Sequence, residues 1–378
     1  MKYKTASFIA ILMALMLFVI GPVALVYLVD PFQIYHKSYF KNAGYSTEQA
    51  YQHAGWINTV LADPAENYSS LIIGSSTMAN YTESLINEHL PWGKTLNLSV
   101  NGSTPRMQAS IARYALAKKP DIKHILWDVH YFYIYEADHD NSKPGSPFPY
   151  YLYNSSILDD KNYLFNTSNV NFSLQFLRGD FTKFSLGIEN NGPFYENLLA
   201  EGRFAAHGSD DYKQNTILPA IQDVARVLPP ADELDAYQYP SIDKNLLDVL
   251  MPYCNSDKDI AIMFSPEDRS AYTNTTNTEH IVRKINMRRY IVNQTRGCKN
   301  IRIFSFDNLD WITAHPENYA DDFHFTIEIN HYIADSIARN LNRLTPENID
   351  EYQANFIDNI NHYKSRLLAD LAHNAPKR

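Results

Sequence analysis

The sequence predicts an α/β fold, a three-layer α/β/α sandwich built around a five-stranded parallel sheet. Short apolar runs rich in β-branched residues alternate with longer segments of helical character between residues 70 and 306, and small polar or turn-forming residues bound each run. A helix between successive strands returns the chain to the same edge of the sheet, so this alternation favours parallel pairing. The expected strands cover residues 71–73, 95–100, 124–129, 259–265 and 301–306.

Composition limits the classes of function. The chain has 378 residues, enough for one large domain or two ordinary ones. Its net charge of −9 argues against a nucleic-acid partner, which would require a basic surface. Tyrosine and asparagine are abundant, and this favours a surface that binds sugars or other polar polymers.

An apolar run near the N-terminus predicts a transmembrane helix. Residues 8–29 are almost uninterrupted apolar side chains, about the ~20 residues that span a bilayer. Lys2 and Lys4 precede the run, so we expect a cytoplasmic N-terminus and a main domain outside the cytoplasm. A cleaved signal peptide is the alternative, but its apolar core is usually shorter, and no Ala-x-Ala-like cleavage site precedes Asp30.

The first expected strand leads into Gly74-Ser75-Ser76 and then into a helix expected over residues 78–89. Gly74 permits a sharp turn. A serine at such a strand-to-helix turn lies where backbone N–H groups and the helix dipole favour negative charge, which suits a nucleophile whose reaction develops an oxyanion. The alternative is that these serines only cap a helix.

The second expected strand ends at Asn101 and Gly102, and Pro105 then opens a helix. Ligands bind at the carboxyl ends of strands in open α/β sheets, so Asn101 and Gly102 are candidates for the site, although a simple turn also explains them. Arg106, in the first helical turn, faces either an anionic substrate or solvent.

After the third expected strand the alternation stops. Residues 141–240 are rich in Asn, Ser, Tyr and Phe, and we expect an insertion that caps the site and shapes an acceptor groove or docks a partner. A loop without a function is the alternative. The acidic and histidine side chains just before it follow no recognised ligand spacing, so we expect no metal and no cofactor.

The last two expected strands precede the other candidate site residues. Arg269 follows the fourth strand and is a weak substrate-binding candidate. Asp321 and His324 follow the fifth strand with D-x-x-H spacing, before an amphipathic helix. At that spacing the carboxylate can hold the imidazole in one tautomer, and the imidazole can then take a proton from a serine hydroxyl. A structural histidine at a helix entrance is the alternative.

Cys254 and Cys298 precede the fourth and fifth strands, at the edge opposite the proposed site. If these strands are neighbours, the two cysteines can form a disulfide, and a location outside the cytoplasm supplies the oxidising compartment. Two buried thiols are the alternative.

Three blocks, Gly74-Ser75-Ser76, residues 97–102 and the D-x-x-H block, resemble those of the SGNH (GDSL-type) hydrolase superfamily. The likeness is to its membrane-anchored branch with G-S-S in place of G-D-S, which includes the D-alanine-transfer protein of teichoic-acid modification and the alginate-acetylation proteins. The resemblance implies Ser76 as nucleophile, His324 as general base and Asp321 as its orienter, with oxyanion donors from the Ser76 and Gly102 backbones. The chain departs from the family at the third block, where Trp127-Asp128-Val129-His130 carries no Asn.

The resemblance also implies a domain plan and a function. Residues 1–30 would be the cytoplasmic stub and anchor, 31–140 and 241–344 the two parts of an SGNH-like domain, 141–240 the insertion, and 345–378 a C-terminal helix and tail. The expected activity is extracytoplasmic acyl transfer through an acyl-serine, or ester hydrolysis, by a single-pass cell-membrane protein. Its expected partners are an acyl donor, a cell-envelope polysaccharide or other hydroxyl acceptor, and a membrane-bound O-acyltransferase. A catalytically silent scaffold with the same fold is the alternative.

Overall fold

The computed structural model describes residues 13, 18–37, 45–46, 49–139, 147–179, 184–185, 237–272, 278–315, 318–319 and 321–374. The chain divides into two compact units. Unit 1 contains residues 1–67, 113–120 and 142–190, and unit 2 contains residues 68–112, 121–141 and 191–378.

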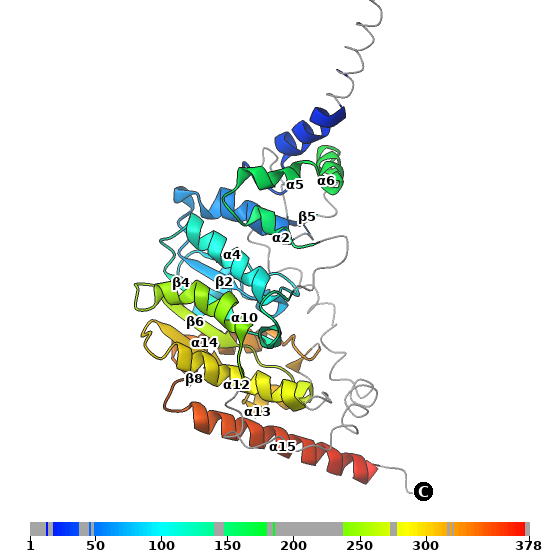
Figure 1. Ribbon diagram of the computed structural model, residues 1–378. Helices are drawn as coiled ribbons and strands as arrows, with labels where there is room; N and C mark the ends of the chain where they lie inside the picture. Colours follow the sequence, from blue (N-terminus) through cyan, green and yellow to red (C-terminus); the bar gives the residue numbers. More distant parts are fainter. Residues whose placement is uncertain are drawn as a thin grey trace, which may run out of the picture. The chain divides into compact units, whose positions relative to one another are not determined.

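Unit 2 is an α/β fold with a six-stranded, mostly parallel sheet (Figure 1). Its strand order is β3-β2-β4-β6-β7-β8, and the first five strands are mutually parallel. The strands are β2 (Ser70–Ile73), β3 (Thr95–Asn97), β4 (His124–Asp128), β6 (Asp259–Phe264), β7 (Ile301–Ser305) and β8 (Arg343–Leu344). The five expected strands are therefore confirmed, most with shorter bounds.

The expectation of a five-stranded, all-parallel sheet is wrong at one edge, where β8 adds an antiparallel sixth strand. Leu344 pairs with Ile303, and Arg343 pairs with Phe304. A strand of two residues is too short to give a recognisable apolar run in the sequence. It pairs with β7 only because the chain turns back toward the sheet after the preceding helix, α14 (Ile327–Ala338).

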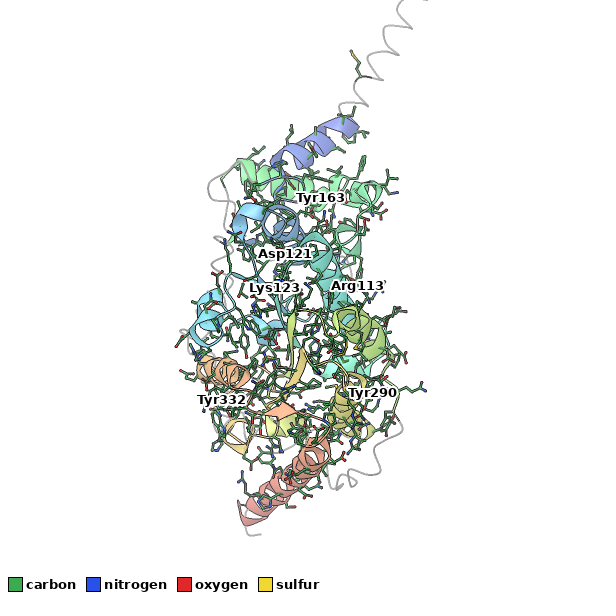
Figure 2. The ribbon with its side chains drawn as sticks, turned by 90° about the vertical axis from the view of Figure 1, so that its left-hand side faces the viewer. Arg113, Asp121, Lys123, Tyr163, Tyr290 and Tyr332 are labelled. Carbon is green, nitrogen blue, oxygen red and sulfur yellow. A yellow bond between two sulfur atoms is a disulfide. The ribbon has the colours of Figure 1, made fainter. Side chains whose placement is uncertain are left out.

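Helices cover both faces of this sheet. On one face, α3 (Glu83–His89) and α14 (Ile327–Ala338) pack against a continuous apolar cluster. On the other face lie the first turns of α4 (Pro105–Lys118) and also α12 (Thr278–Gln294). Figure 2 shows Tyr332 of α14 and Tyr290 of α12 on opposite sides of the sheet. The C-terminal α15 (Ile349–Asn374) packs against α12.

Short helices complete unit 2. They are the 3-10 helices η3 (Ser76–Met78), η4 (Tyr131–Ile134), η12 (Met251–Tyr253) and η13 (Arg269–Tyr272), the π-helix η11 (Asp243–Leu247), and the α-helical turns α10 (Pro240–Ile242), α11 (Asp248–Leu250) and α13 (Asp310–Thr313).

Unit 1 contains a helix over residues 18–29 and several shorter elements. These are β1 (Tyr45–Ser46), which pairs with β5 (Phe184–Ser185), and also α2 (Gln49–Trp56), η1 (Ile57–Leu61), η2 (Pro64–Glu66), η5 (Tyr150–Leu152), η6 (Ile157–Asp160), α5 (Lys161–Leu164) and α6 (Thr167–Leu177). The buried Asp30 ends the first helix, and its carboxylate accepts the backbone N–H groups of Ile34, Tyr35 and His36.

Two expectations fall partly outside the described residues. Within the ranges that the structure describes, no helix is long and apolar enough to cross a membrane, but residues 8–12 and 14–17 of the expected anchor lie outside those ranges. Of the expected insertion, residues 147–179 and 184–185 belong to unit 1 and residues 237–240 to unit 2. Its residues 141–146, 180–183 and 186–236 lie outside the description.

The predicted disulfide is confirmed. Cys254 and Cys298 are bonded, with their Cα atoms 4.9 Å apart. The two residues precede β6 and β7, which are neighbours in the sheet. The bond therefore lies at the amino-terminal edge of the strands.

Candidate active site

Ser76 lies in a tight turn directly after β2. Ser75 is extended, with φ −105° and ψ −158°, and Ser76 begins the 3-10 helix η3. A Cβ atom on Gly74 would lie 2.4 Å from Cγ of Met78 and 3.1 Å from Cβ of Asp128. Since real Cβ atoms essentially never approach another atom as closely as 2.4 Å, any larger residue here would force Met78 to move, and a glycine lets the turn pack tightly against β4.

The expected helix over residues 78–89 is wrong in its first half. After η3 the chain stays non-helical until α3 begins at Glu83. The Thr82 hydroxyl accepts the N–H of Leu85 at 3.2 Å, which caps α3. The turn that carries Ser76 is therefore separate from α3, so an oxyanion at Ser76 would be stabilised by local N–H groups rather than by the dipole of a long helix.

Ser76, His324 and Asp321 lie in one hydrogen-bonded chain. The Ser76 Oγ atom is 2.7 Å from Nε2 of His324, and Nδ1 of the same ring is 2.5 Å from Oδ2 of Asp321. The other carboxylate oxygen accepts the backbone N–H of Phe323 at 2.9 Å and that of His324 at 2.8 Å. At the D-x-x-H spacing, the Asp321 carboxylate thus binds both the backbone of the turn and the imidazole ring.

The charge of Asp321 fixes the tautomer of His324. Burial by itself would raise the pKa of Asp321, but the hydrogen bond and charge of His324 outweigh it and hold that pKa below its usual value. An ionised Asp321 only accepts hydrogen bonds, so Nδ1 of His324 carries the proton and Nε2 presents a lone pair to the Ser76 hydroxyl. The His324 side chain is 24% exposed, so the ring is reachable from solvent.

Ser75 takes a different partner. Its hydroxyl lies 3.2 Å from the hydroxyl of Thr77, and the residue is buried. The structure therefore distinguishes the two adjacent serines, since Ser76 is the one bonded to the imidazole.

The loop after β3 is hydrogen-bonded to the turn that carries Ser76. Both the N–H of Val100 and the hydroxyl of Ser103 donate to the Gly74 carbonyl, at 3.2 and 2.9 Å. Between them Asn101 and Gly102 are exposed, and Gly102 has a φ of +67°. This left-handed conformation favours glycine. It places the proposed oxyanion donor in a loop anchored directly to the turn that carries Ser76.

Asn97, at the end of β3, hydrogen-bonds the chain that follows Ser76, a role that its position in a strand did not indicate. Its side-chain amide donates to the carbonyls of Met78 and Tyr81, at 2.7 and 3.1 Å, and its oxygen accepts the N–H of Ser99. The buried amide thus satisfies the backbone at the end of η3 and at the start of its own loop.

Asp128, at the end of β4, contacts the turn that carries Ser76 through Thr77. Its carboxylate accepts the Thr77 hydroxyl at 2.7 Å and the Ser265 hydroxyl at 2.7 Å. Burial raises its pKa to about 6, although these hydrogen bonds oppose the shift. At this position, where the SGNH-type pattern that the sequence resembles has an Asn, the chain thus places a carboxylate that supports the turn.

The two arginine candidates have different surroundings. Arg269 is 1% exposed, and its guanidinium donates to Oδ1 of Asp310 at 2.7 Å and to the Thr313 hydroxyl at 2.6 Å. The Arg269 side chain is thus buried, and it pairs with a carboxylate that is itself 66% exposed. Arg106 lies half-buried in the first turn of α4, four residues after Gly102.

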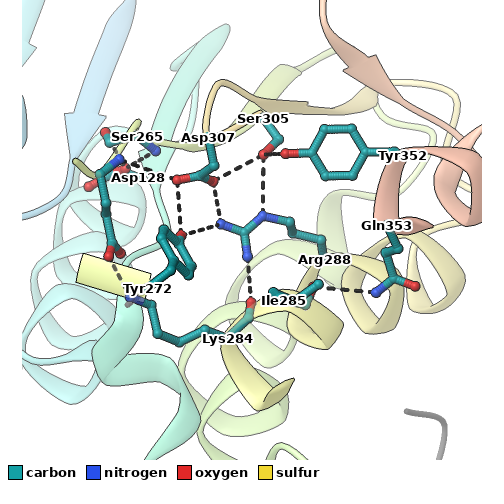
Figure 3. A network of polar contacts seen from close by, with 11 residues as sticks. Asp128, Ser265, Tyr272, Lys284, Ile285, Arg288, Ser305, Asp307, Tyr352 and Gln353 are labelled. Carbon is teal, nitrogen blue, oxygen red and sulfur yellow. Dashed lines mark hydrogen bonds and ion pairs between the residues drawn. The ribbon is translucent and has the colours of Figure 1, made fainter. Parts of the chain in front are cut away.

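A buried charge network, made of Glu267, Lys284, Arg288 and Asp307, lies past the carboxyl ends of β6 and β7 (Figure 3). Arg288 pairs with Asp307 and also donates to the Ser305 hydroxyl, and Lys284 pairs with Glu267. Sequence reasoning missed this network because its members come from separate strands and a helix.

Sequence comparison assigns no family to the chain. No protein-family model matches it, and no curated protein matches it significantly.

Proposed function

We propose that unit 2 is an SGNH-type serine acyltransferase or esterase that works through an acyl-serine. The observation that carries the proposal is the continuous chain from the Ser76 hydroxyl through His324 to Asp321. The nucleophile, the base and the orienter of a serine hydrolase have this arrangement on several unrelated folds. The strand order, with helices on both faces of the sheet, supports the flavodoxin-like sandwich of that superfamily.

The reaction would proceed in two half-reactions. His324 Nε2 takes the Ser76 proton as Oγ attacks an ester or thioester carbonyl, and the backbone N–H groups of Ser76 and Gly102 stabilise the oxyanion. Collapse expels the alcohol or thiol, which takes the proton from His324. An acceptor hydroxyl or water then gives its proton to His324 and attacks the acyl-serine, which forms the new ester or the free acid and restores Ser76.

The proposed setting is the outer side of a cell membrane. The disulfide supports an oxidising compartment, and the apolar run over residues 8–29 supports an anchor. Together with the resemblance, these features favour a cell-envelope polysaccharide as acceptor and a membrane-bound O-acyltransferase as partner. Intact-mass measurement of the membrane fraction should find residues 1–29 retained; a new N-terminus near Asp30 would instead indicate a cleaved signal peptide.

The departure at the third block favours a second candidate, a scaffold without catalytic activity. An Asn side chain can donate a hydrogen bond to an oxyanion, whereas an ionised Asp cannot. Asp128 is also engaged with Thr77 and Ser265. A scaffold would retain the fold and would bind the polymer without turnover.

A fluorophosphonate probe distinguishes the two candidates, since only an activated serine reacts rapidly. We expect labelling of the wild-type chain, none of Ser76→Ala, and near-normal labelling of the matched control Ser75→Ala. A wild-type chain that does not label while folded would support the scaffold. Turnover of an activated acyl ester with and without a sugar acceptor then separates transfer from hydrolysis.

A further inference from the structure

Two helices on one face of the sheet bring together three side chains that could bind a metal ion. Glu88 and His89 end α3, and His331 lies in the second turn of α14. Nε2 of His89 lies 3.0 Å from Nδ1 of His331, and Oε2 of Glu88 lies 3.5 Å from the same Nδ1 atom. Among the residues that the structure describes, these form the one group of at least three His, Cys, Asp or Glu side chains whose ligand atoms lie within 4.8 Å of one another.

The spacing of these atoms fits a transition-metal ion. Zinc binds imidazole nitrogen and carboxylate oxygen at about 2.0–2.2 Å, so two ligands in tetrahedral geometry lie roughly 3.3 Å apart. The two nitrogens would have to separate by only a few tenths of an ångström. Each imidazole can keep its proton on the nitrogen that faces away from the ion, since neutral histidine has one acceptor nitrogen.

The surroundings combine a fixed backbone with access from solvent. Beside the cluster, α3 and α14 pack through buried apolar side chains that include Leu85, Ile86 and Ile333. The Glu88 side chain is 62% exposed and that of His331 is 38% exposed. An ion can therefore reach the site while the helices hold the ligands in place, and water would fill the remaining coordination position.

We propose that Glu88, His89 and His331 form a Zn²⁺ site that joins α3 to α14. The inference does not depend on the proposed acyl transfer. A bound ion would link two helices that lie next to the candidate site in the chain. Helix α3 follows the turn that carries Ser76, and α14 begins three residues after His324. An ion bound only by the folded chain stabilises the packing of these helices by mass action.

Calorimetric titration of the untagged, chelator-treated full-length chain with Zn²⁺ tests the site. We expect about one ion per chain, at least a tenfold loss of affinity in His89→Ala and in His331→Ala, and no change in His362→Ala, which removes an exposed histidine of α15. Mg²⁺ should not bind, since it prefers an all-oxygen site.

Thermal unfolding gives a second readout. Zn²⁺ should raise the unfolding midpoint of the wild type and of His362→Ala, but not that of His331→Ala. If an alanine variant misfolds, Glu88→Gln still tests the site. It changes a side chain that is mostly exposed, so it should weaken Zn²⁺ binding while the fold is kept. Absence of Zn²⁺ binding at micromolar concentration, or wild-type affinity in the histidine and Glu88 variants, would show that the histidine pair is only a hydrogen bond.

Discussion

At the scale of single residues, the candidate site depends on one carboxylate that orients an imidazole. Asp321 uses one oxygen for two backbone N–H groups and the other for Nδ1 of His324. The same side chain therefore fixes the loop and the tautomer. An amide at this position would keep the shape but would lose the charge that stabilises the imidazolium.

We predict that Asp321→Asn slows fluorophosphonate labelling of Ser76 by roughly 10³–10⁴-fold, because the wrong tautomer would face the serine. The measurement is the labelling rate of the folded variant, and Asp322→Asn is the neighbouring control. A rate for Asp321→Asn within about tenfold of the wild type would show that the carboxylate does not support the base.

Asp128 should make stability depend on pH. Its pKa is raised to about 6 by burial, so the folded chain holds this proton more tightly than the unfolded chain does. This proton binding contributes fully to the free energy of unfolding below the pKa that Asp128 has in the unfolded chain. The contribution is lost as pH rises through the folded pKa of about 6.

We predict that the free energy of unfolding of the wild type falls, relative to that of Asp128→Asn, by about 1.4 kcal/mol between about pH 5 and pH 7.5. The amide cannot ionise, and it can still bond Thr77 and Ser265, since the Thr77 hydroxyl can accept as well as donate. Urea unfolding of both chains across this range gives the difference. Parallel pH profiles would mean that Asp128 has an ordinary pKa.

At the scale of elements, the carboxyl and amino ends of the strands have different roles. The carboxyl ends of β2 and β3 lead to the candidate site, and the amino ends of β6 and β7 are joined by the disulfide. The cross-link encloses a sequence separation of 44 residues. It acts on the ensemble of unfolded chains and leaves the triad contacts unchanged.

We predict that the double variant Cys254→Ala/Cys298→Ala unfolds with a free energy about 4 kcal/mol lower in the chain-entropy treatment, while the labelling rate of Ser76 stays close to that of the wild type. Denaturant titration measures the first quantity and probe kinetics the second. A loss below about 1 kcal/mol would imply that the unfolded chain is already constrained in this region.

At the scale of the whole of unit 2, buried charges join elements that are distant in sequence. Arg288 of α12 pairs with Asp307 after β7, and it shares the Ser305 hydroxyl with Tyr352 of α15. Burial opposes the charge of Arg288, but Asp307 outweighs that effect and raises the pKa of the guanidinium. The helices over this face are therefore joined by polar contacts as well as by apolar packing.

We predict that Arg288→Ala lowers the free energy of unfolding by about 3–5 kcal/mol, because Asp307 would remain as a buried and uncompensated charge. Arg339→Ala is the matched control, since Arg339 pairs with Asp335 on an exposed surface and such pairs contribute at most about 1 kcal/mol. Chemical unfolding compares the two variants. Similar losses in both would contradict the role assigned to burial.

The sequence by itself determined the features that depend on local pattern. Alternating apolar runs identified the five parallel strands, the D-x-x-H spacing placed Asp321 beside His324, and the positions of the cysteines before two consecutive strands predicted their bond. These features could be predicted because strand periodicity, turn chemistry and parallel connections follow from nearby residues.

Only the tertiary structure decided the contacts between residues far apart in the chain. It set 2.7 Å between the Ser76 hydroxyl and His324, placed the Asp128 carboxylate beside the Thr77 hydroxyl, and paired the buried Arg269 with Asp310. It also added β8 and brought His89 to His331, 242 positions later. The physical reason is that register and helix packing fix such pairs collectively, so no local pattern records which distant side chain will meet which.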